Sequence, residues 1–523
     1  MNAETRTDPG LSSHVTAAPF GPYHALPARH LDCPAVTVGC LVFALVLFLP
    51  PILNDGDTLW QISTGAWIID HRVIPAFDPF SFTAGNRPWF AHEWLAETLM
   101  ALAFRVGGMR GVMALAAATS GLTAAMLLHH ARRFLPGLYA LTAVVVALSV
   151  AAGSMLARPH LIAWPCLALW CGSLVIARSN RTAPSFALLP IMVLWVNLHG
   201  SFMVGLLLSG AFMVEAALES GAHRRRIFAS WAGFVLAAWS AALINPDFLA
   251  GVLFPIHLVG MKSLAMIGEW EPPDFSHFQV LEVVILGGLA LGLTGKVTLP
   301  PIRLLILLGL VYGALSHARN GQLLAIIGML VLAEPLGASL AGDSLVGTSL
   351  APGRREALGL RWRWLSAGAP LLAAAALVAR IALPLSPERT GAAFATMLDV
   401  VPLSLRTQPV LNEYALGGQL IFNGVRPFID GRADLYGDAF LDRYQRIVLP
   451  DPAELSRTLS EYHIAWTIFP AGHPIVPVMD EMPGWRRLID TGDVVVHARE
   501  RTVSSPHLPN ATLRSGSPPP RVN

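Results

Sequence analysis

Charged residues are scarce in this chain. Asp, Glu, Lys and Arg make up 13% of its 523 residues, whereas soluble domains carry about 25%. Hydrophobic residues account for 54%, and the mean hydropathy is +0.54. This shortage of charge excludes an ordinary soluble protein and indicates a membrane protein.

Cysteine and net positive charge are also in short supply. The four cysteines are too few for a disulfide framework, and Cys166 and Cys171 fall inside an apolar run, where they are expected to act as small core residues. The net charge of +2 argues against a nucleic-acid partner, which would require a basic face. The N-terminus has neither the basic segment nor the cleavage site of a signal peptide. We therefore expect residues 1–34 to form a disordered cytoplasmic tail.

Long apolar runs are abundant. A transmembrane helix needs about 20 mostly apolar residues, and eleven runs qualify as candidates. The expected class is mainly α, a polytopic bundle with a core over 35–338, and the segment EWLAETLMALAFR (93–105) is expected to form an interfacial helix leading into the second span. The candidate spans are 35–53, 108–128, 137–156, 161–177, 186–198, 201–218, 227–244, 278–294, 301–316, 320–338 and 366–385.

Lys and Arg gather in alternate loops between these spans, with the run Arg224, Arg225 and Arg226 as the densest case. Cytoplasmic loops carry such an excess. The N-terminus is therefore predicted to be cytoplasmic, and the loop 54–93 and everything after 385 are predicted to lie outside.

The composition changes after the tenth run. Residues 339–365, with Gly, Ser and several Arg, are expected to be a cytoplasmic linker before the last span, 366–385. Residues 386–500 alternate short apolar stretches such as IAWTIFP with the helix-like PAELSRTLSEYH, which predicts a small extracytoplasmic α/β domain. The Pro- and Ser-rich residues 501–523 are expected to be disordered.

The loop 54–93 combines acids with large aromatic residues. It contains Asp55, Asp57, Asp78, His92 and Glu93, together with three Trp and several Phe. The Trp residues are expected to anchor the loop at the membrane interface, with sugar stacking as the alternative. Such a loop is typical of a segment that covers a polar site.

Further polar residues lie at the predicted outer ends of the spans. Ionisable groups at membrane depth are costly and are usually found facing a water-filled cavity or one another. The set therefore predicts a polar cavity that opens outward, although each residue alone could cap a helix or reach to the interface. Its members are Arg158, His160, Asn197, His199, Glu269, His317 and Arg319.

This set suggests a definite chemistry. Asp55 or Asp57 could remove a proton from an acceptor hydroxyl, or both could join His92 and Glu93 in holding a divalent metal ion. A phosphate would suit the basic residues Arg158, His160, His199, His317 and Arg319. Simpler roles remain open, since Asp57 could cap the helix that starts at Thr58 and Asp78 precedes a proline and could start a turn.

Four motifs carry a resemblance to a known class: DGDTLWQISTGAWIIDHRVIPAFDPFSFT, RPWFAHEWL, WVNLHGSF and NEYALGGQLIFNGVRPFIDGRADLYGD. Together with the order of spans, outer loop and C-terminal domain, they resemble the GT-C class of membrane glycosyltransferases, which includes the protein O-mannosyltransferases, the aminoarabinose lipid A transferases and the oligosaccharyltransferase catalytic subunits. The resemblance implies a bacterial inner-membrane enzyme, a polyprenyl-phosphate-linked sugar donor, inversion at the anomeric carbon and a first-loop carboxylate as base. Asp55 and Asp57 match the acidic position.

Three functional hypotheses follow. The first is a glycosyltransferase that acts on a glycan, lipid or protein acceptor, with Asp430, Arg432 and Asp434 of the C-terminal domain as acceptor contacts, unless these form a turn with a structural ion pair. The second is a lipid or saccharide transporter, which would place its site near the membrane midplane. The third is a non-catalytic envelope-assembly protein, which predicts no pocket between the first loop and the span ends.

Overall fold

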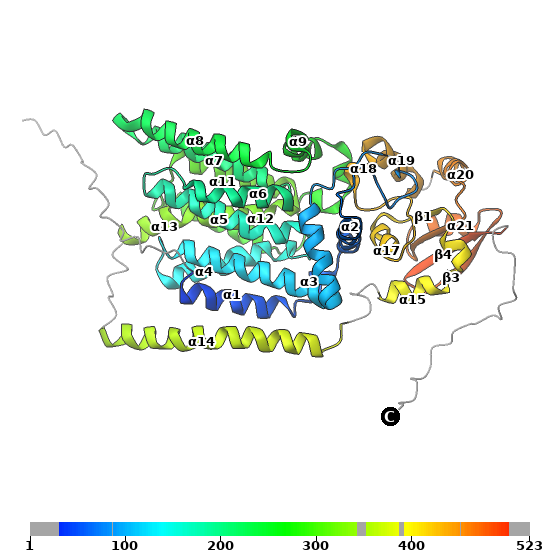
Figure 1. Ribbon diagram of the computed structural model, residues 1–523, viewed down its shortest axis with the longest axis horizontal. Coiled ribbons are helices and arrows are strands. Elements are labelled where there is room, and N and C mark those ends of the chain that lie inside the picture. The colour runs from blue at the N-terminus through cyan, green and yellow to red at the C-terminus, as the bar shows by residue number, and fades with distance from the viewer. Residues whose placement is uncertain (1–30, 86, 343–351, 386–391, 450, 501–523) are drawn as a thin grey trace, which may run out of the picture.

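The chain forms a long helix bundle with a small mixed domain attached to one end (Figure 1). This computed structural model describes residues 31–85, 87–342, 352–385, 392–449 and 451–500. Residues 501–523, most of the N-terminal tail and part of the predicted linker lie outside the described residues. The mainly α membrane fold with a small C-terminal sheet is the class that the sequence predicts.

Each of the eleven predicted spans lies on a helix of the bundle. Six helices among the described residues are long and apolar enough to cross a membrane, and other apolar helices are 10–17 residues long, so the count of eleven spans stays a prediction. The bundle helices are α1 (Cys33–Val46), α3 (Trp94–Ala131), α4 (Gly137–Ala151), α5 (Pro159–Ser179), α6 (Leu189–Leu198), α7 (Phe202–Leu218), α8 (Arg224–Ala242), α10 (Val280–Leu293), α11 (Pro301–Ser316), α12 (Gly321–Leu323), α13 (Met329–Gly342) and α14 (Pro352–Ala382).

Helix α3 is too long to be a single span. Its 38 residues would extend about 57 Å at 1.5 Å per residue, nearly twice the hydrocarbon thickness of about 30 Å. Gly107 and Gly108 break it, with Gly108 at a φ of 58°, and the part before the break lies across the end of the bundle (Figure 1). This part corresponds to the predicted interfacial helix over 93–105.

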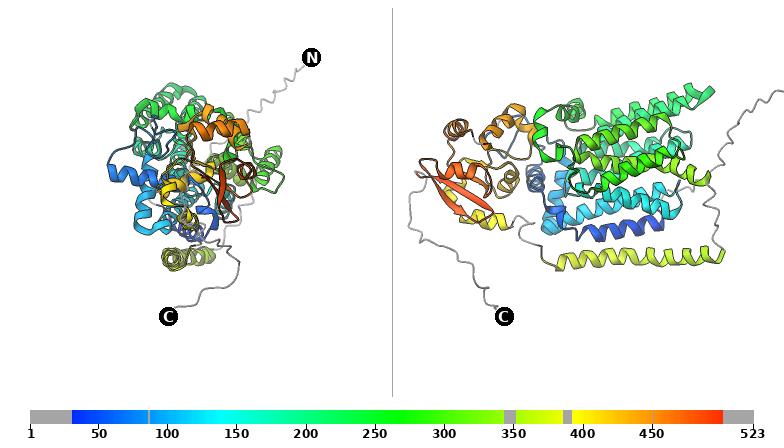
Figure 2. Two further views of the ribbon diagram at one scale, coloured as in Figure 1. Left: turned by 90° about the vertical axis from the view of Figure 1, so that its right-hand side faces the viewer. Right: turned by 180° about the vertical axis from the view of Figure 1, so that it is seen from behind.

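The helices pack closely where glycines face one another. A Cβ added to Gly121 of α3 would lie 2.5 Å from the carbonyl oxygen of Gly39 in α1, so the two backbones touch. Small residues allow this approach in membrane bundles, where dispersion contacts replace the hydrophobic effect. Helix α14 packs along α1 at the edge of the bundle (Figures 1 and 2).

The end of the bundle next to the C-terminal domain carries two helices outside the main stack. Helix α2 (Asp57–His71) belongs to the first outer loop and packs against α3 and α17. Helix α9 (Phe248–Val259) is a short apolar helix that the sequence did not predict separately. Its 12 residues are too few for a span.

The C-terminal domain is built on one mixed sheet of order β1-β2-β4-β3, in which β1 and β2 are parallel and the other pairs antiparallel. Trp60 and Trp89 of the first outer loop share a hydrophobic cluster with Phe428 and Tyr436 of this domain, so the two parts have a common core. The strands are β1 (Val410–Asn412), β2 (Trp466–Pro470), β3 (Trp485–Asp490) and β4 (Val494–Arg499), and the helices are α15 (Ala392–Val400), α16 (Leu403–Arg406), α17 (Gly417–Phe422), α18 (Ala433–Tyr436), α19 (Asp438–Val448), α20 (Pro452–Glu461) and α21 (Ile475–Asp480).

Candidate active site

A polar cavity of about 220 Å³ lies where the first outer loop, the bundle end and the C-terminal domain meet. Helix α2 contributes its N-terminus, and the starts of α3 and α5 contribute the residues that precede them. Segments far apart in the sequence thus converge, as the grouping of polar residues on one side predicts. The predicted site residues that line this cavity are Asp55, Asp57, His92, Glu93, Arg158, His160, His199, Glu269, Arg319, Arg432 and Asp434.

Asp55 and Asp57 occupy different environments, although one residue separates them. Both carboxylate oxygens of Asp55 accept hydrogen bonds from the Arg158 guanidinium, and its Oδ1 accepts from the Asp57 backbone N–H at 3.1 Å. The Asp55 side chain is 3% exposed and the Asp57 side chain is 26% exposed. Asp55 therefore fixes the start of α2, while Asp57 faces the cavity.

The Asp57 carboxylate lies between a cation and an indole. Its Oδ2 is 3.2 Å from Nη2 of Arg158, and its Oδ1 accepts a hydrogen bond from Nε1 of Trp60 at 3.0 Å. Burial raises the pKa of Asp57 to about 6; Arg158 opposes this rise, and the carboxylates of Asp55 and Glu269 add to it. A carboxyl group with this pKa can accept a proton near neutral pH.

Arg158 is neutralised by its carboxylate neighbours. Besides Asp55 and Asp57, its Nη1 lies 2.5 Å from Oε1 of Glu269. A guanidinium held in this way orients the acids around it. The structure thus places the predicted phosphate ligand Arg158 next to the predicted bases.

Arg319 lines the cavity without forming an ion pair in the described part of the chain. Its guanidinium stacks over the Trp270 ring, with Cζ 4.5 Å from the ring centroid. Among the described residues that line this cavity, Arg158, Arg432, His92 and His199 form ion pairs, whereas Arg319 takes part in none. Arg319 is therefore available to an anionic ligand.

His199 is held in a single neutral tautomer. The backbone N–H of Ser201 donates to its Nδ1 at 3.1 Å, so Nε2 carries the proton, and this nitrogen faces Oε1 of Glu93 at 3.5 Å. Burial lowers the pKa of His199 well below its ordinary value, and the nearby His160, Arg319 and His92 add to the effect. Burial also raises the pKa of Glu93.

The other predicted histidines support their neighbours. His160 lies 2.7 Å from the Ser154 carbonyl oxygen through Nε2, and its ring centroid is 6.1 Å from that of His199. His317 reaches the Trp270 carbonyl oxygen through Nδ1 at 2.6 Å, and its ring lies edge-on to the Trp270 ring at 5.5 Å between centroids. His92 packs its ring on Phe254.

The residues expected to hold a metal ion do not assemble into one ligand set. Asp55 and Asp57 face Arg158, whereas His92 and Glu93 face each other, and Glu93 also faces His199. Within the described ranges, no group of three or more His, Cys, Asp or Glu side chains is arranged to hold a metal ion. The residues present therefore do not fit the metal site that the sequence left open.

Two expected pocket residues are buried in structural roles. Asn197 accepts a hydrogen bond from Nε1 of Trp94 at 2.8 Å and donates to the Ile244 carbonyl oxygen at 2.9 Å. Asp78 caps its own turn, accepting from the N–H groups of Phe80 and Ser81 at 2.9 Å. The turn that the Asp78-Pro79 sequence suggests is therefore formed.

The C-terminal domain contributes part of the cavity wall. Burial raises the pKa of Asp434 to about 6, while Arg432 and a hydrogen bond from Trp89 oppose the rise and Asp430 adds to it. Asp430 itself is fully buried, where it accepts hydrogen bonds from Arg432 and Tyr436. Of the three residues expected to contact the acceptor, Asp434 is thus the one that lies outside the ion pair of Asp430 and Arg432.

Gln61 and Tyr414, which were not predicted from the sequence, also line the cavity. Gln61 is 3% exposed, and its Oε1 has no hydrogen-bond partner within the described part of the chain. Since it follows Asp57 by four residues on one helix face, that spacing could have revealed it. Tyr414 gave no signal of this kind.

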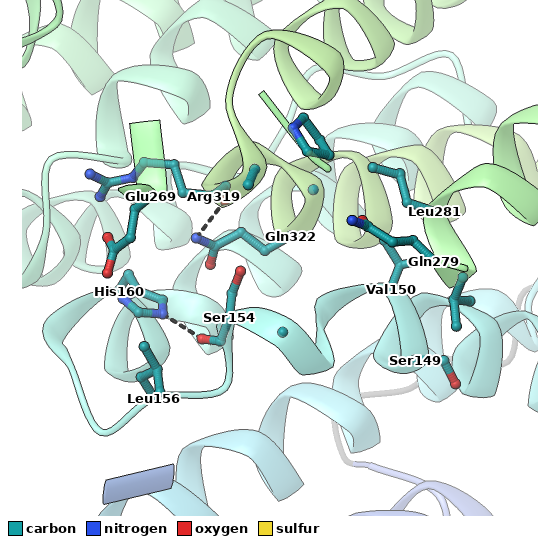
Figure 3. Close-up of a pocket in the computed structure, with 15 residues that line it drawn as sticks. Ser149, Val150, Ser154, Leu156, His160, Glu269, Gln279, Leu281, Arg319 and Gln322 are labelled. Atoms are coloured by element: carbon teal, nitrogen blue, oxygen red, sulfur yellow. Dashed lines mark hydrogen bonds between the residues drawn. The ribbon is translucent and has the colours of Figure 1, made fainter. Parts of the chain in front are cut away.

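Two further cavities adjoin the polar one and share His160 and Arg319 with it. The first, of about 390 Å³, has mainly apolar walls from α5, α7 and α9, including Leu167, Val204 and Ile256. The second is about 330 Å³, and there Glu269, Arg319 and His160 lie together at one end and Val150 and Leu281 at the other (Figure 3). Arg319 thus stands where polar and apolar spaces meet.

No protein-family model and no curated protein sequence matches the chain. Among solved structures, it is similar to the oligosaccharyltransferase of Archaeoglobus fulgidus in the apo form, with a TM-score of 0.52 at 12% identity, over 84% of this chain and 69% of the other. It is also similar to ArnT from Cupriavidus metallidurans bound to undecaprenyl phosphate, with a TM-score of 0.48 at 12% identity, over 90% and 98% of the two chains. The first likeness shows that the chain has the GT-C fold that the motifs suggested.

Proposed function

We propose that this protein is a membrane glycosyltransferase that transfers a sugar from a polyprenyl-phosphate-linked donor to an envelope acceptor. The observation that carries the proposal is the placement of Asp57 and Arg319 in one cavity. Asp57 offers a carboxylate with a pKa of about 6, and Arg319 offers a cation with no ion-pair partner in the described ranges. A base and an anion-binding group are the two parts that such a transfer requires.

In the proposed mechanism, the oxygen of an acceptor hydroxyl attacks the anomeric carbon of the donor sugar. Asp57 accepts the proton that this hydroxyl loses. The bond from that carbon to the phosphate oxygen breaks, its electron pair leaves with the lipid phosphate, and the anomeric configuration inverts. Arg319 stabilises the charge of the phosphate, and the Nε2–H group of His199 donates a further hydrogen bond to it. Arg158 orients Asp57, so that positioning and electrostatics supply most of the rate.

The apolar cavity beside Arg319 supports a lipid-linked donor. Arg319 lines this cavity together with apolar residues of α5, α7 and α9, so a phosphate at Arg319 would have its hydrocarbon chain against apolar residues. A free sugar nucleotide would gain nothing from such walls. The cavity that holds Asp57 and Arg319 lies at one end of the bundle, which disfavours a transporter with a midplane site, and it lies between the first loop and the span ends, which disfavours the assembly protein.

The distribution of Lys and Arg supports the orientation in the membrane. We place the cavity and the C-terminal domain on the outer, periplasmic face of a bacterial inner membrane, with the N-terminus in the cytoplasm. The acceptor would then be an envelope glycan, lipid or protein that reaches the cavity past Asp434.

The test is transfer by the purified protein reconstituted with a polyprenyl-phosphate sugar and a cell-envelope acceptor extract. Asp57→Asn is expected to lower kcat by about 10²- to 10⁴-fold, the usual contribution of a general base. Asp55→Asn should also lower kcat, because Arg158 loses its main partner. Glu481→Gln, at an exposed acid of the C-terminal domain, is the control and should leave the rate unchanged. Full activity in both Asp variants would refute the proposed base.

A further inference from the structure

Arg432 is a buried cation that joins the C-terminal domain to the first outer loop. It is 1% exposed, and its Nη1 donates to Oδ1 of Asp78 at 2.7 Å, across the boundary between the two parts. Its Nε and Nη2 donate to the two oxygens of Asp430, both at 2.7 Å, and the Tyr436 hydroxyl donates to Asp430 at 2.7 Å. A buried charge persists only when it is paired and hydrogen-bonded in this way.

Three aromatic rings of the first outer loop surround the same guanidinium. Cζ of Arg432 lies 4.7 Å from the Trp89 centroid, 5.3 Å from that of Phe80 and 6.0 Å from that of Trp60. Such cation–π contacts are worth most where water is excluded. Trp60 and Trp89, which were expected to anchor the loop at the membrane interface, are buried here and enclose a side chain of another domain together with Phe80.

The residue before Arg432 touches the proposed base. A Cβ added to Gly431 would lie 1.9 Å from Oδ1 of Asp57 and 3.1 Å from Nε1 of Trp60, so the backbone at Gly431 packs directly on the carboxylate. On its other sides Asp57 faces Arg158, Asp55 and Glu269, and Tyr414 lies close by. The C-terminal domain thus covers one side of Asp57.

We propose that Arg432 is a positioning residue, and that through it the C-terminal domain completes the active site by holding Gly431 against Asp57. This inference rests on the proposed function, in which Asp57 is the base. It assigns the C-terminal domain a part in the chemical step, in addition to contact with the acceptor.

Arg432→Gln tests this directly, because it removes the charge and leaves a shorter polar side chain that cannot reach Asp78 and Asp430 together. Without the link to Asp78, segment 430–434 would let water reach Asp57. The pKa of Asp57 would then fall, because burial is what raises it. The acidic limb of the pH profile of kcat/KM should then move to lower pH, and kcat should fall about tenfold to a hundredfold, as misplacement near a reacting group does. Hydrogen exchange over residues 78–85 should become faster, and Arg432→Lys should recover part of each effect.

Two further variants complete the test. Gly431→Ala leaves the ion pairs intact but disturbs the contact with Asp57, so it should also displace the acidic limb; it decides the question if Arg432→Gln does not fold. Arg487→Gln removes an exposed arginine that pairs with Asp480 and Asp490 in the same domain and should change neither measurement.

The inference would be overturned if the acidic limb of the kcat/KM profile stayed at the same pH in both Arg432→Gln and Gly431→Ala. A purely structural role would lower the maximum of kcat/KM without moving this limb. If the wild-type protein transfers no sugar, the proposed function fails. Hydrogen exchange then tests, without any activity measurement, whether Arg432 holds the C-terminal domain to the first outer loop. Unchanged exchange over 78–85 in Arg432→Gln would refute this link.

Discussion

At the scale of single residues, Asp57 is distinguished by its surroundings. Asp55, two positions earlier, has both oxygens on Arg158, whereas Asp57 keeps an exposed fraction of 26% toward the cavity. Partial burial beside other carboxylates raises its pKa to about 6. Asp57 can therefore be ionised at neutral pH and still be a better base than an ordinary aspartate.

The pH dependence of transfer follows from this pKa. A general base acts when deprotonated, so kcat/KM should fall as the pH drops through about 6. Asp434 titrates in the same range, so Asp434→Asn is the matched variant for the pH–rate measurement. Asp434→Asn should still show the fall of kcat/KM at acidic pH, even if its rate is lower. If that fall disappears in Asp434→Asn, the titrating group is Asp434 and not Asp57.

Gln61 gives a second prediction at this scale. Its buried Oε1 lacks a partner in the described chain, and a buried polar atom without a partner costs about 1–3 kcal/mol. Gln61→Leu should therefore leave the melting temperature unchanged or higher, yet raise KM for the acceptor severalfold through one lost hydrogen bond.

Thermal unfolding and steady-state kinetics on the same preparation measure both effects. A lower melting temperature together with an unchanged KM would show that Gln61 supports the fold and does not contact the substrate.

At the scale of helices, the close crossing of α1 and α3 depends on glycine. Gly121→Ala would place a Cβ 2.5 Å from the Gly39 carbonyl oxygen and should destabilise the bundle by about 1–3 kcal/mol, as overpacking does. Gly233→Ala in α8 is the control, because its Cβ meets nothing within 4 Å and alanine has the higher helix propensity. Equal melting temperatures of the two variants in detergent would contradict this account of the crossing.

The positions of the helices follow from the sequence because long apolar runs require backbone hydrogen bonds within the segment. The same reasoning predicted the amphipathic start of α3, and α20 covers most of the stretch PAELSRTLSEYH. It did not predict α9, since an apolar run of 12 residues is too short to count as a span. The π-helical turn over Leu324–Gly328 likewise has no signature in hydropathy.

At the scale of the whole molecule, assigning the loops alternately to the two sides of the membrane predicted that the candidate site residues lie at one end. The assignment uses only the order of the spans and the Lys and Arg content of the loops. The residues that it placed on one side line one cavity. The pairings inside the cavity could not be predicted, because the contacts of Arg158 with Asp55 and Glu269 depend on how distant helices pack. Arg432 was expected to meet an acceptor unless it formed a structural ion pair with Asp430, and the structure shows this ion pair. Its second partner, Asp78, could not be predicted for the same reason.

The most direct test of the central claim is a cryo-electron microscopy map of the protein in nanodiscs containing a polyprenyl monophosphate. The account predicts phosphate density against Arg319, in the same cavity as Asp57, with the hydrocarbon chain along α5, α7 and α9. A phosphate bound elsewhere, with the cavity between Asp57 and Arg319 left without lipid, would contradict it.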